Sequence, residues 1–287
     1  MKDLPFALGH PQATVTVPDS IDSLAALERT THLGIGAHPD DLEFMCWHPI
    51  LECFDKGDSW FGGIIASDGR ASPRLGRYAD IEQAEMAQVR LKEQKHAAIS
   101  GEYSVVVNLM YPELGRVMEA EGVTPLVEDL KNLIGRVRPK AVYTHNIMDK
   151  HRHHVLVSFC VVKALRELGF TPERFLGCEV WRGLDWLPDG DKVTFDVSAH
   201  QNLTNSLMGV YDSQISGGKR YDLATAGRKR TNATYFDPYH PDEAELLEFA
   251  VDLMPLLADP NMTPVEYARQ LIGRFESEVV EGLEKLC

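Results

Sequence analysis

Short apolar runs alternate with helix-type patterns four times in the first 170 residues, and no other feature constrains the fold more. The runs cover residues 32–37, 60–66, 103–110 and 141–144, and a segment with helical periodicity follows each of them. Alternating strands and helices form βαβ units, in which helices cover both faces of a parallel sheet. The sequence therefore predicts an α/β fold around a mostly parallel sheet.

From residue 177 the pattern changes to extra strands and helices. The segments that we expect there are strands over 178–181 and 193–197, a helix over 200–214, a long loop over 216–239, a helix over 242–257 and a last helix that ends the C-terminal region 242–287. The last helix opens with a capping box made by Thr263 and Glu266, and its apolar stripe is expected to pack against the sheet. With 287 residues and 44% hydrophobic content, we expect one domain over 1–287, with its core at about 32–236.

Charge and cysteine usage narrow the class of protein. The net charge of −14, from 43 acidic and 29 basic residues, argues against a nucleic-acid partner, because such a partner requires a basic surface. The 5 cysteines are scattered, which favours reduced thiols in the cytoplasm. The N-terminus lacks a signal-peptide pattern, and no apolar run approaches the ~20 residues that cross a bilayer. We expect a cytoplasmic protein with no membrane partner, and its assembly into a homo-oligomer stays open.

Two polar motifs follow predicted strands directly. The first strand leads into His38-Pro-Asp-Asp41, and the fourth is followed by Asp149-Lys-His-Arg-His-His154. Ligands in an open parallel sheet bind beyond the carboxyl ends of the strands, so both motifs should face one crevice. If the two strands are neighbours, His38, Asp41 and His154 can converge on one ion. Two imidazoles and a carboxylate, with positions left for water, form the ligand set of a catalytic zinc site.

The residues beside these ligands suit catalysis. Asp40 lies between two predicted ligands and points elsewhere, so it can act as the general base for a water molecule that the metal activates. His151 lies one turn from His154 and can stabilise the oxyanion as it forms. A His-Pro-Asp-Asp segment alone is also typical of a helix N-terminus whose acids complement the macrodipole. The second histidine cluster favours the metal site, whereas His153 is a solvated turn residue or a support for the ligands.

The motif Ala37-His-Pro-Asp-Asp-Leu-Glu43, with a later Asp-x-His-x-x-His, resembles the LmbE-like or PIG-L deacetylases. The resemblance covers about residues 32–170, with a weaker match to about Phe236. It implies a Rossmann-like sheet without a nucleotide and a zinc-dependent hydrolase that removes acetyl groups from N-acetylglucosamine-type amines. It also implies that His38, Asp41 and His154 hold zinc, that Asp40 is the base, and that His151 stabilises the tetrahedral intermediate.

Two further residues are assigned to substrate binding by the same resemblance. Arg90 matches a helical Arg-x-x-Glu pattern in which the arginine reaches the sugar, although a surface ion pair between Arg90 and Glu93 explains that spacing equally well. Glu113 stands where many members have an aspartate that binds sugar hydroxyls. His153 departs from the family, because many members have an acid directly before the last ligand. His48 likewise stands where the family has Gly-Gly-Thr, and we interpret it as structural or exposed.

The leading hypothesis is a zinc-dependent N-deacetylase that acts on an N-acylated amino sugar or its conjugate, with another divalent metal as an alternative to zinc. Two alternatives are an amidase for a larger amide conjugate and a catalytically altered, metal-dependent binding protein for glycans or small molecules. Arginines at 70, 74, 220 and 228 either meet an anionic substituent or pair with the surplus of acids. A dinucleotide enzyme is set aside, because Gly34-Ile-Gly36 is not followed by a third glycine at the expected place.

Overall fold

The computed structural model describes residues 4, 6–112, 114 and 123–287. Its strands are β1 (Thr14–Thr16), β2 (His32–Gly36), β3 (Phe61–Ser67), β4 (Val105–Tyr111), β5 (Ala141–His145), β6 (Arg174–Cys178), β7 (Lys192–Asp196) and β8 (Leu247–Asp252). They form one 8-stranded sheet in the order β1-β4-β3-β2-β5-β6-β8-β7. The five strands from β4 to β6 in this order are parallel, while β1, β8 and β7 join antiparallel at the two sides. The predicted α/β fold with a mostly parallel sheet is therefore confirmed.

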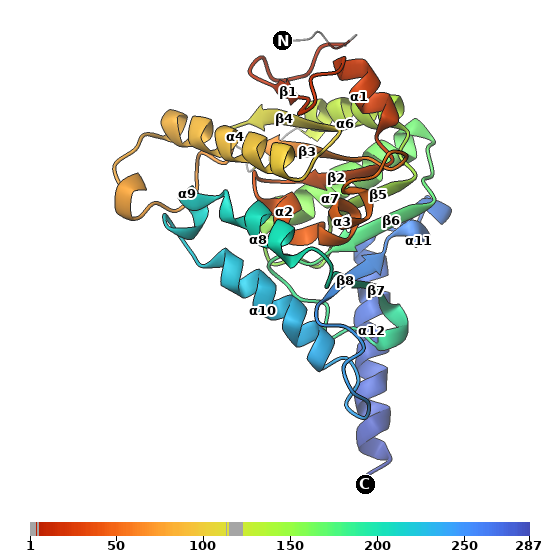
Figure 1. The fold of residues 1–287 in the computed structure, drawn as a ribbon. Helices are drawn as coiled ribbons and strands as arrows, with labels where there is room; N and C mark the ends of the chain where they lie inside the picture. Colours follow the sequence, from red (N-terminus) through yellow and green to blue (C-terminus); the bar gives the residue numbers. More distant parts are fainter. Residues whose placement is uncertain (1–3, 5, 113, 115–122) are drawn as a thin grey trace.

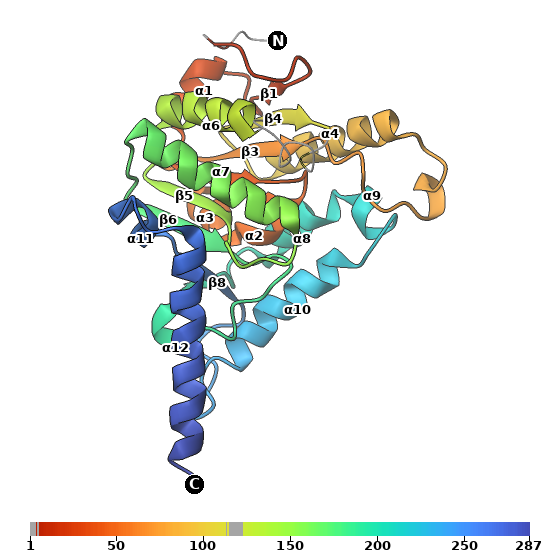
Figure 2. The same cartoon turned by 180° about the vertical axis from the view of Figure 1, so that it is seen from behind.

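Helices cover both faces of the sheet. They are α1 (Ser23–Arg29), α2 (Asp41–Met45), α3 (Trp47–Cys53), α4 (Gln83–Ser100), α6 (Val123–Val137), α7 (Arg152–Leu168), α8 (Gln201–Gly209), α9 (Asp212–Ile215), α10 (Tyr221–Thr234), α11 (Met254–Ala258) and α12 (Pro264–Glu284), with short 3-10 turns η1 (Gly76–Tyr78) and η2 (Asp189–Asp191). One face carries α2, α3, α4 and α8, and the opposite face carries α1, α6 and α7 (Figures 1 and 2). No helix within the described residues is long and apolar enough to cross a membrane.

Strand β2 explains how a helix comes to lie directly on the sheet. Its odd-numbered residues Leu33 and Ile35 point into the core beneath α1, α6 and α7. Gly34, which lies between them, and its partner Gly63 of β3 leave space for Leu42 of α2 on the other face. A Cβ atom on Gly34 would lie 2.8 Å from Leu42 Cδ2, and one on Gly63 would lie 2.5 Å from Leu42 Cδ1. The side chain of Leu42 therefore fixes α2 against β2 and β3.

Strands β2 and β5 are parallel neighbours, paired from His32–Ala141 to Ile35–Thr144. The segments that follow the two strands therefore begin side by side at one edge of the sheet, as the metal-site hypothesis requires. Helix α7 begins seven residues after β5 and packs on the face opposite α2, with Val157 and Val161 fully buried. It ends at Leu168 and is capped by Gly169, whose φ of 61° is the left-handed conformation typical of a helix C-terminus.

Three secondary-structure predictions for the C-terminal part are wrong. The strand predicted over 178–181 is β6, which spans Arg174–Cys178 and shares only Cys178 with that range. The helix predicted over 242–257 is instead strand β8, followed by the short α11, because β8 fills a central place between β6 and β7 and buries Phe249 and Val251. Glu248, a residue that favours helices, is buried in this strand and pairs with Lys229 at 2.7 Å. The long loop predicted over 216–239 contains α10, whose apolar pattern is weak because two of its three buried residues, Lys229 and Asn232, are polar.

Three smaller differences concern the remaining helices and the first strand. The single helical segment expected after residues 32–37 is divided at Cys46 into α2 and α3, and Pro49 is tolerated in the first turn of α3. The capping box of α12 is confirmed, but only the first part of its apolar stripe packs against the body, since Leu271 is 1% exposed and Leu283 is 59% exposed. Figures 1 and 2 show the rest of α12 projecting away from the sheet. The short strand β1 was not predicted.

Candidate metal centre

The side chains of His38, Asp41 and His154 meet at the edge of the sheet where β2 and β5 end. Nδ1 of His38 lies 3.2 Å from Oδ2 of Asp41, and Nε2 of His154 lies 3.3 Å from Oδ1 of Asp41 and 3.3 Å from Nδ1 of His38. One ligand atom from each residue lies within 4.8 Å of those of the other two. Asp41 and His154 are buried, and His38 is half-buried. The structure thus brings together the three predicted ligands, whose metal-binding role stays a prediction.

Local hydrogen bonds fix the side chains of Asp41 and His151 at the first turns of α2 and α7. The backbone N–H of His38 donates to Oδ2 of Asp41 at 2.7 Å, which fixes the carboxylate at the first turn of α2. Asp40 precedes this turn with a φ of 111°, a left-handed conformation that is costly for a residue with a Cβ atom. At the start of α7, Nδ1 of His151 accepts from the backbone N–H of His153 at 3.2 Å, so His151 serves as the N-cap.

The charges around Asp41 favour its ionised form. Although burial opposes ionisation, the imidazoles of His154, His145 and His38 hold the pKa of Asp41 well below its ordinary value. Burial likewise opposes the charged form of His154, but Asp41 and Asp149 raise its pKa to about 9. A carboxylate surrounded by imidazole nitrogens is a donor set of the kind that binds Zn²⁺ and similar divalent cations. The residues present therefore fit such an ion.

Sequence reasoning missed His145, which is fully buried beside the centre. Its Nε2 lies 3.2 Å from Oδ2 of Asp41 and accepts from the backbone N–H of Ala37 at 3.0 Å. Burial and, to a smaller extent, the charge of the nearby His154 lower the pKa of His145 to about 4, although Asp41 opposes this shift. Its place at the carboxyl end of β5, next to the strand that carries the first motif, is the signal that could have identified it.

Asp40 is buried beside the centre and faces Arg90. Oδ1 of Asp40 lies 3.1 Å from Nη2 of Arg90, which also donates to the backbone carbonyl of Pro39. Burial raises the pKa of Asp40 well above its ordinary value, and the charge of Arg90 opposes this rise. Arg90 is only 2% exposed, so the alternative of a surface ion pair does not describe it. Glu93 instead accepts hydrogen bonds from the backbone N–H and the hydroxyl of Ser213, at 2.8 and 2.6 Å.

The last residue of the first motif, Glu43, is fully buried behind the centre. Its Oε1 accepts from the Tyr103 hydroxyl at 2.8 Å and from Nε2 of Gln94 at 2.9 Å, and its Oε2 accepts from the Tyr211 hydroxyl at 2.7 Å. These partners lie on α4, just before β4, and just before α9. One carboxylate therefore ties α2 to three other parts of the chain.

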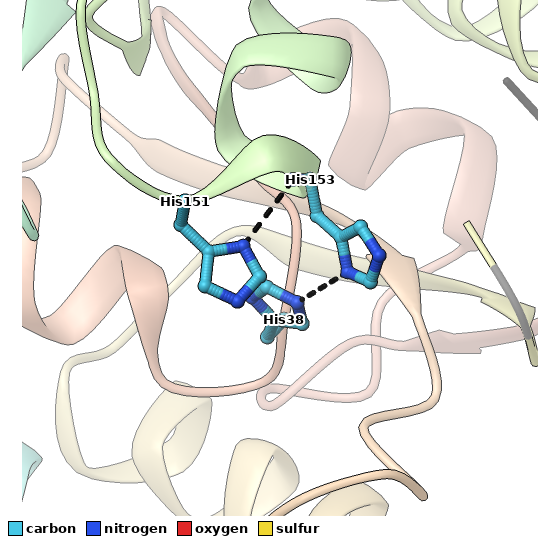
Figure 3. A group of neighbouring side chains, drawn as sticks. All are labelled: His38, His151 and His153. Carbon is cyan, nitrogen blue, oxygen red and sulfur yellow. Dashed lines mark hydrogen bonds between the residues drawn. The ribbon is translucent and has the colours of Figure 1, made fainter. Parts of the chain in front are cut away.

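A cavity of about 480 Å³ opens in front of the centre. It is lined by His38, Asp40, Asp41, Arg90, His151, His153 and residues of the loop 67–73 and of the segment 214–228. Figure 3 shows His151 and His153 beside His38, and the ring centroids of His38 and His151 are 4.8 Å apart. The ring of Trp181 forms part of the wall, 6.1 Å from that of His151. The predicted substrate-binding residue Glu113 lies outside the described residues.

The arginines that were predicted to face the substrate differ in the groups with which they pair. Arg70 pairs with Asp68 and Arg220 with Asp222, both on the cavity wall, whereas Arg74 donates to backbone carbonyls and does not line the cavity. His48 is half-buried, 3.0 Å from Glu52, and stacks on Phe195 with ring centroids 3.7 Å apart. Its surroundings agree with the structural interpretation of this spare imidazole.

These features define an open α/β domain with a candidate metal centre beyond the carboxyl ends of two adjacent parallel strands. Residues 33–165 match the sequence model of the family described as PIG-L: GlcNAc-PI de-N-acetylase. This part of the chain is a PIG-L domain, of the LmbE-like type. A search of curated protein sequences finds no match to the chain.

Three solved structures are similar in fold. The 4-carboxy-2-hydroxymuconate hydratase GalB from Pseudomonas putida KT2440 has a TM-score of 0.61 at 15% identity, over 82% of this chain and 98% of that one. The N,N'-diacetylchitobiose deacetylase from Pyrococcus horikoshii has a TM-score of 0.62 at 14% identity, over 80% and 86% of the two chains. The A40926 pseudoaglycone deacetylase Dbv21 has a TM-score of 0.58 at 17% identity, over 78% and 97%. At these identities the likeness establishes the fold alone.

Proposed function

We propose that the protein is a metal-dependent hydrolase that removes an N-acetyl or other acyl group from an amino sugar or an amino-sugar conjugate. The observation that carries the proposal is the convergence of His38, Asp41 and His154 at the cavity, with Asp40 and His151 on the cavity wall. The description of the matching family supports the same chemistry. Zn²⁺ is the proposed ion, because the donor set of two imidazoles and one carboxylate suits it. Bound there, it would polarise the acyl carbonyl and make water more acidic.

Asp40 is proposed as the general base. A general base works best when its pKa lies near the working pH. The ordinary pKa of an aspartate is too low for this role, and burial raises the pKa of Asp40 well above that ordinary value. The ion pair with Arg90 holds the Asp40 carboxylate in one orientation, and the positive charge of Arg90 limits the rise in its pKa. Asp40 can therefore take a proton from water beside the centre and pass it to the departing amine.

His151 is proposed to stabilise the oxyanion. Burial and the nearby His38 lower its pKa to about 3, so the ring is neutral at pH 7. Because Nδ1 accepts from the backbone N–H of His153, the neutral ring carries its proton on Nε2. An N–H group fixed in this way can donate to the negative oxygen that develops during acyl transfer.

The cavity suits a small sugar derivative with a polar or anionic substituent. Its volume lies within the range of about 300–1,000 Å³ that is typical of small-molecule sites. Trp181 and Tyr221 offer aromatic surface for a sugar ring, and their centroids are 6.0 Å apart. The amine of Lys219 lies 4.7 Å from the Trp181 ring and, among the described residues, has no carboxylate within ion-pair distance. We propose that Lys219 meets an anionic substituent and that Arg90 contributes to substrate binding.

The direct test is to incubate zinc-loaded protein with neutral and anionic N-acetylated sugars and with larger N-acyl conjugates, and to follow the release of free amine. Release of acetate and amine from a sugar supports the proposal, and release only from large conjugates favours the amidase. The fold alone does not choose a reaction, since a hydratase shares it. Protein that is loaded with metal and retains N-acetylated sugars intact would instead be a binding protein.

A further inference from the structure

Three imidazoles form a second group on the cavity side of the centre. This outer histidine group consists of His38, His151 and His153 (Figure 3), and one ring nitrogen of each lies within 4.8 Å of those of the other two. Nε2 of His38 is 3.1 Å from Nδ1 of His153. All three rings are half-buried and line the cavity, so an ion that enters from solvent can reach them.

His38 belongs to both groups through opposite ring nitrogens. Its Nδ1 faces Asp41 and His154, while its Nε2 faces His153. Either nitrogen of an imidazole can bind a metal ion. One ring therefore stands between two sets of ligands, and His153 completes the second set.

We propose that the outer histidine group binds a second divalent cation of the Zn²⁺, Ni²⁺ or Cu²⁺ type, with His38 as a ligand shared between the two ions. Imidazole is a preferred ligand of these metals. Two nitrogens on one tetrahedral zinc ion lie about 3.4 Å apart, given Zn–N bonds of about 2.1 Å, and the His38 and His153 nitrogens already lie near that separation. The inference goes beyond the proposed function, because it concerns ion binding and not the reaction.

The second ion binds more weakly than the first. When His38 holds both ions it is an imidazolate, and its Nε2 proton passes to solvent, so binding competes with protonation. His151 ligates through Nε2, and its proton moves to Nδ1, which ends the hydrogen bond from the His153 N–H and weakens the N-cap of α7. The outer group also contains no carboxylate to offset the charge of the ion. An ion there occupies Nε2 of His151 and blocks the cavity beside it.

The test counts metal ions on the full-length protein. Chelator-treated protein is titrated with Zn²⁺ by calorimetry and with Co²⁺ by absorption spectroscopy. The wild-type protein is expected to bind a first equivalent of Zn²⁺ and then a second with an affinity about 10-fold or more lower. Removing the groups that support metal ligands typically lowers metal affinity by this amount. Anomalous diffraction at the zinc edge should then place the second ion between His38 and His153.

The His153→Asn variant decides the outcome. It is expected to bind only the first equivalent, whereas His240→Asn, which changes an exposed histidine bonded to Asp237, should still bind two. A single equivalent in the wild-type protein would overturn the proposal, and so would a second equivalent that persists in His153→Asn. Loss of both equivalents in a folded His153→Asn protein would also overturn it, because His153 would then support the first site. Failure of deacetylation changes none of these counts, so the two proposals can fail separately.

Discussion

At the residue scale, the centre depends on two adjacent aspartates, Asp40 and Asp41, whose pKa values are shifted in opposite directions. Asp41 lies among three imidazoles, which keep its pKa well below the ordinary value, while burial pushes the pKa of the adjacent Asp40 well above it. Divergent pKa values of this kind separate a ligand from a base. The two carboxylates have different partners, because Asp40 pairs with Arg90 while Asp41 contacts the imidazoles.

The first prediction concerns Asp40→Asn. The amide cannot accept a proton from water, so we expect deacetylation to fall by about 100- to 10,000-fold. Asparagine tolerates the αL conformation, so the fold and the metal content should be retained. Initial rates and elemental analysis on the same preparation check both. Unchanged activity in metal-loaded Asp40→Asn protein would remove Asp40 from the mechanism.

The sequence could predict which residues approach one another but not all of their contacts. His38, Asp41 and His154 follow from the strand ends and the motif spacing. The contact between Arg90 and Asp40 crosses 50 positions and depends on how α4 lies over α2, which no local pattern encodes. The burial of His145 depends likewise on packing between β5 and α7.

At the element scale, buried carboxylates join segments that local patterns treat as separate. Glu43 connects α2 to α4, Tyr103 and Tyr211, and Glu248 connects β8 to α10 through Lys229. The first four strand–helix units were predictable because each has its own apolar periodicity, whereas β8 and α10 were not predicted. Glu248 favours a helix locally and is held in a strand by an ion pair with a distant helix.

The second prediction is that Glu43→Ala destabilises the protein. The change leaves the Tyr103 and Tyr211 hydroxyls and the Gln94 amide without their acceptor, and each unpaired buried group costs about 1–3 kcal/mol. We expect the free energy of unfolding to fall by about 3 kcal/mol in total, as measured by urea denaturation. Tyr211→Phe removes one donor only and should cost about 1 kcal/mol. A loss in Glu43→Ala no larger than in Tyr211→Phe would contradict this account.

At the scale of the whole molecule, α12 is anchored at one end and projects at the other (Figure 1). Near its start, Leu271 is buried and the Tyr267 hydroxyl donates to the backbone carbonyl of Asp252 at 2.7 Å. Towards its end, Val279 and Leu283 are about half exposed to solvent, at 45% and 59%. The stability of the body should therefore depend on the first half of this helix alone.

A matched pair of variants tests this. Leu271→Ala removes a buried side chain and should lower the free energy of unfolding by about 2–5 kcal/mol. Leu283→Ala makes the same chemical change on the same helix at an exposed position, and we expect a change within about 0.5 kcal/mol. Chemical denaturation of both variants under one set of conditions gives the comparison. Equal losses would show that the projecting half is also packed in solution.

The last prediction joins the centre to global stability. The pairing of Asp41 with three imidazoles exists only in the folded chain, so an ion bound there stabilises the native state and not the unfolded one. At an ion concentration 100-fold above its dissociation constant, the gain is about 2.7 kcal/mol. Thermal unfolding of chelator-treated and zinc-loaded protein should therefore differ clearly. Asp41→Asn should lose this difference, because an amide oxygen is a poor substitute for the carboxylate, while Asp40→Asn should keep it. If both variants respond to zinc like the wild-type protein, the ion that stabilises the fold is bound somewhere other than between β2 and β5.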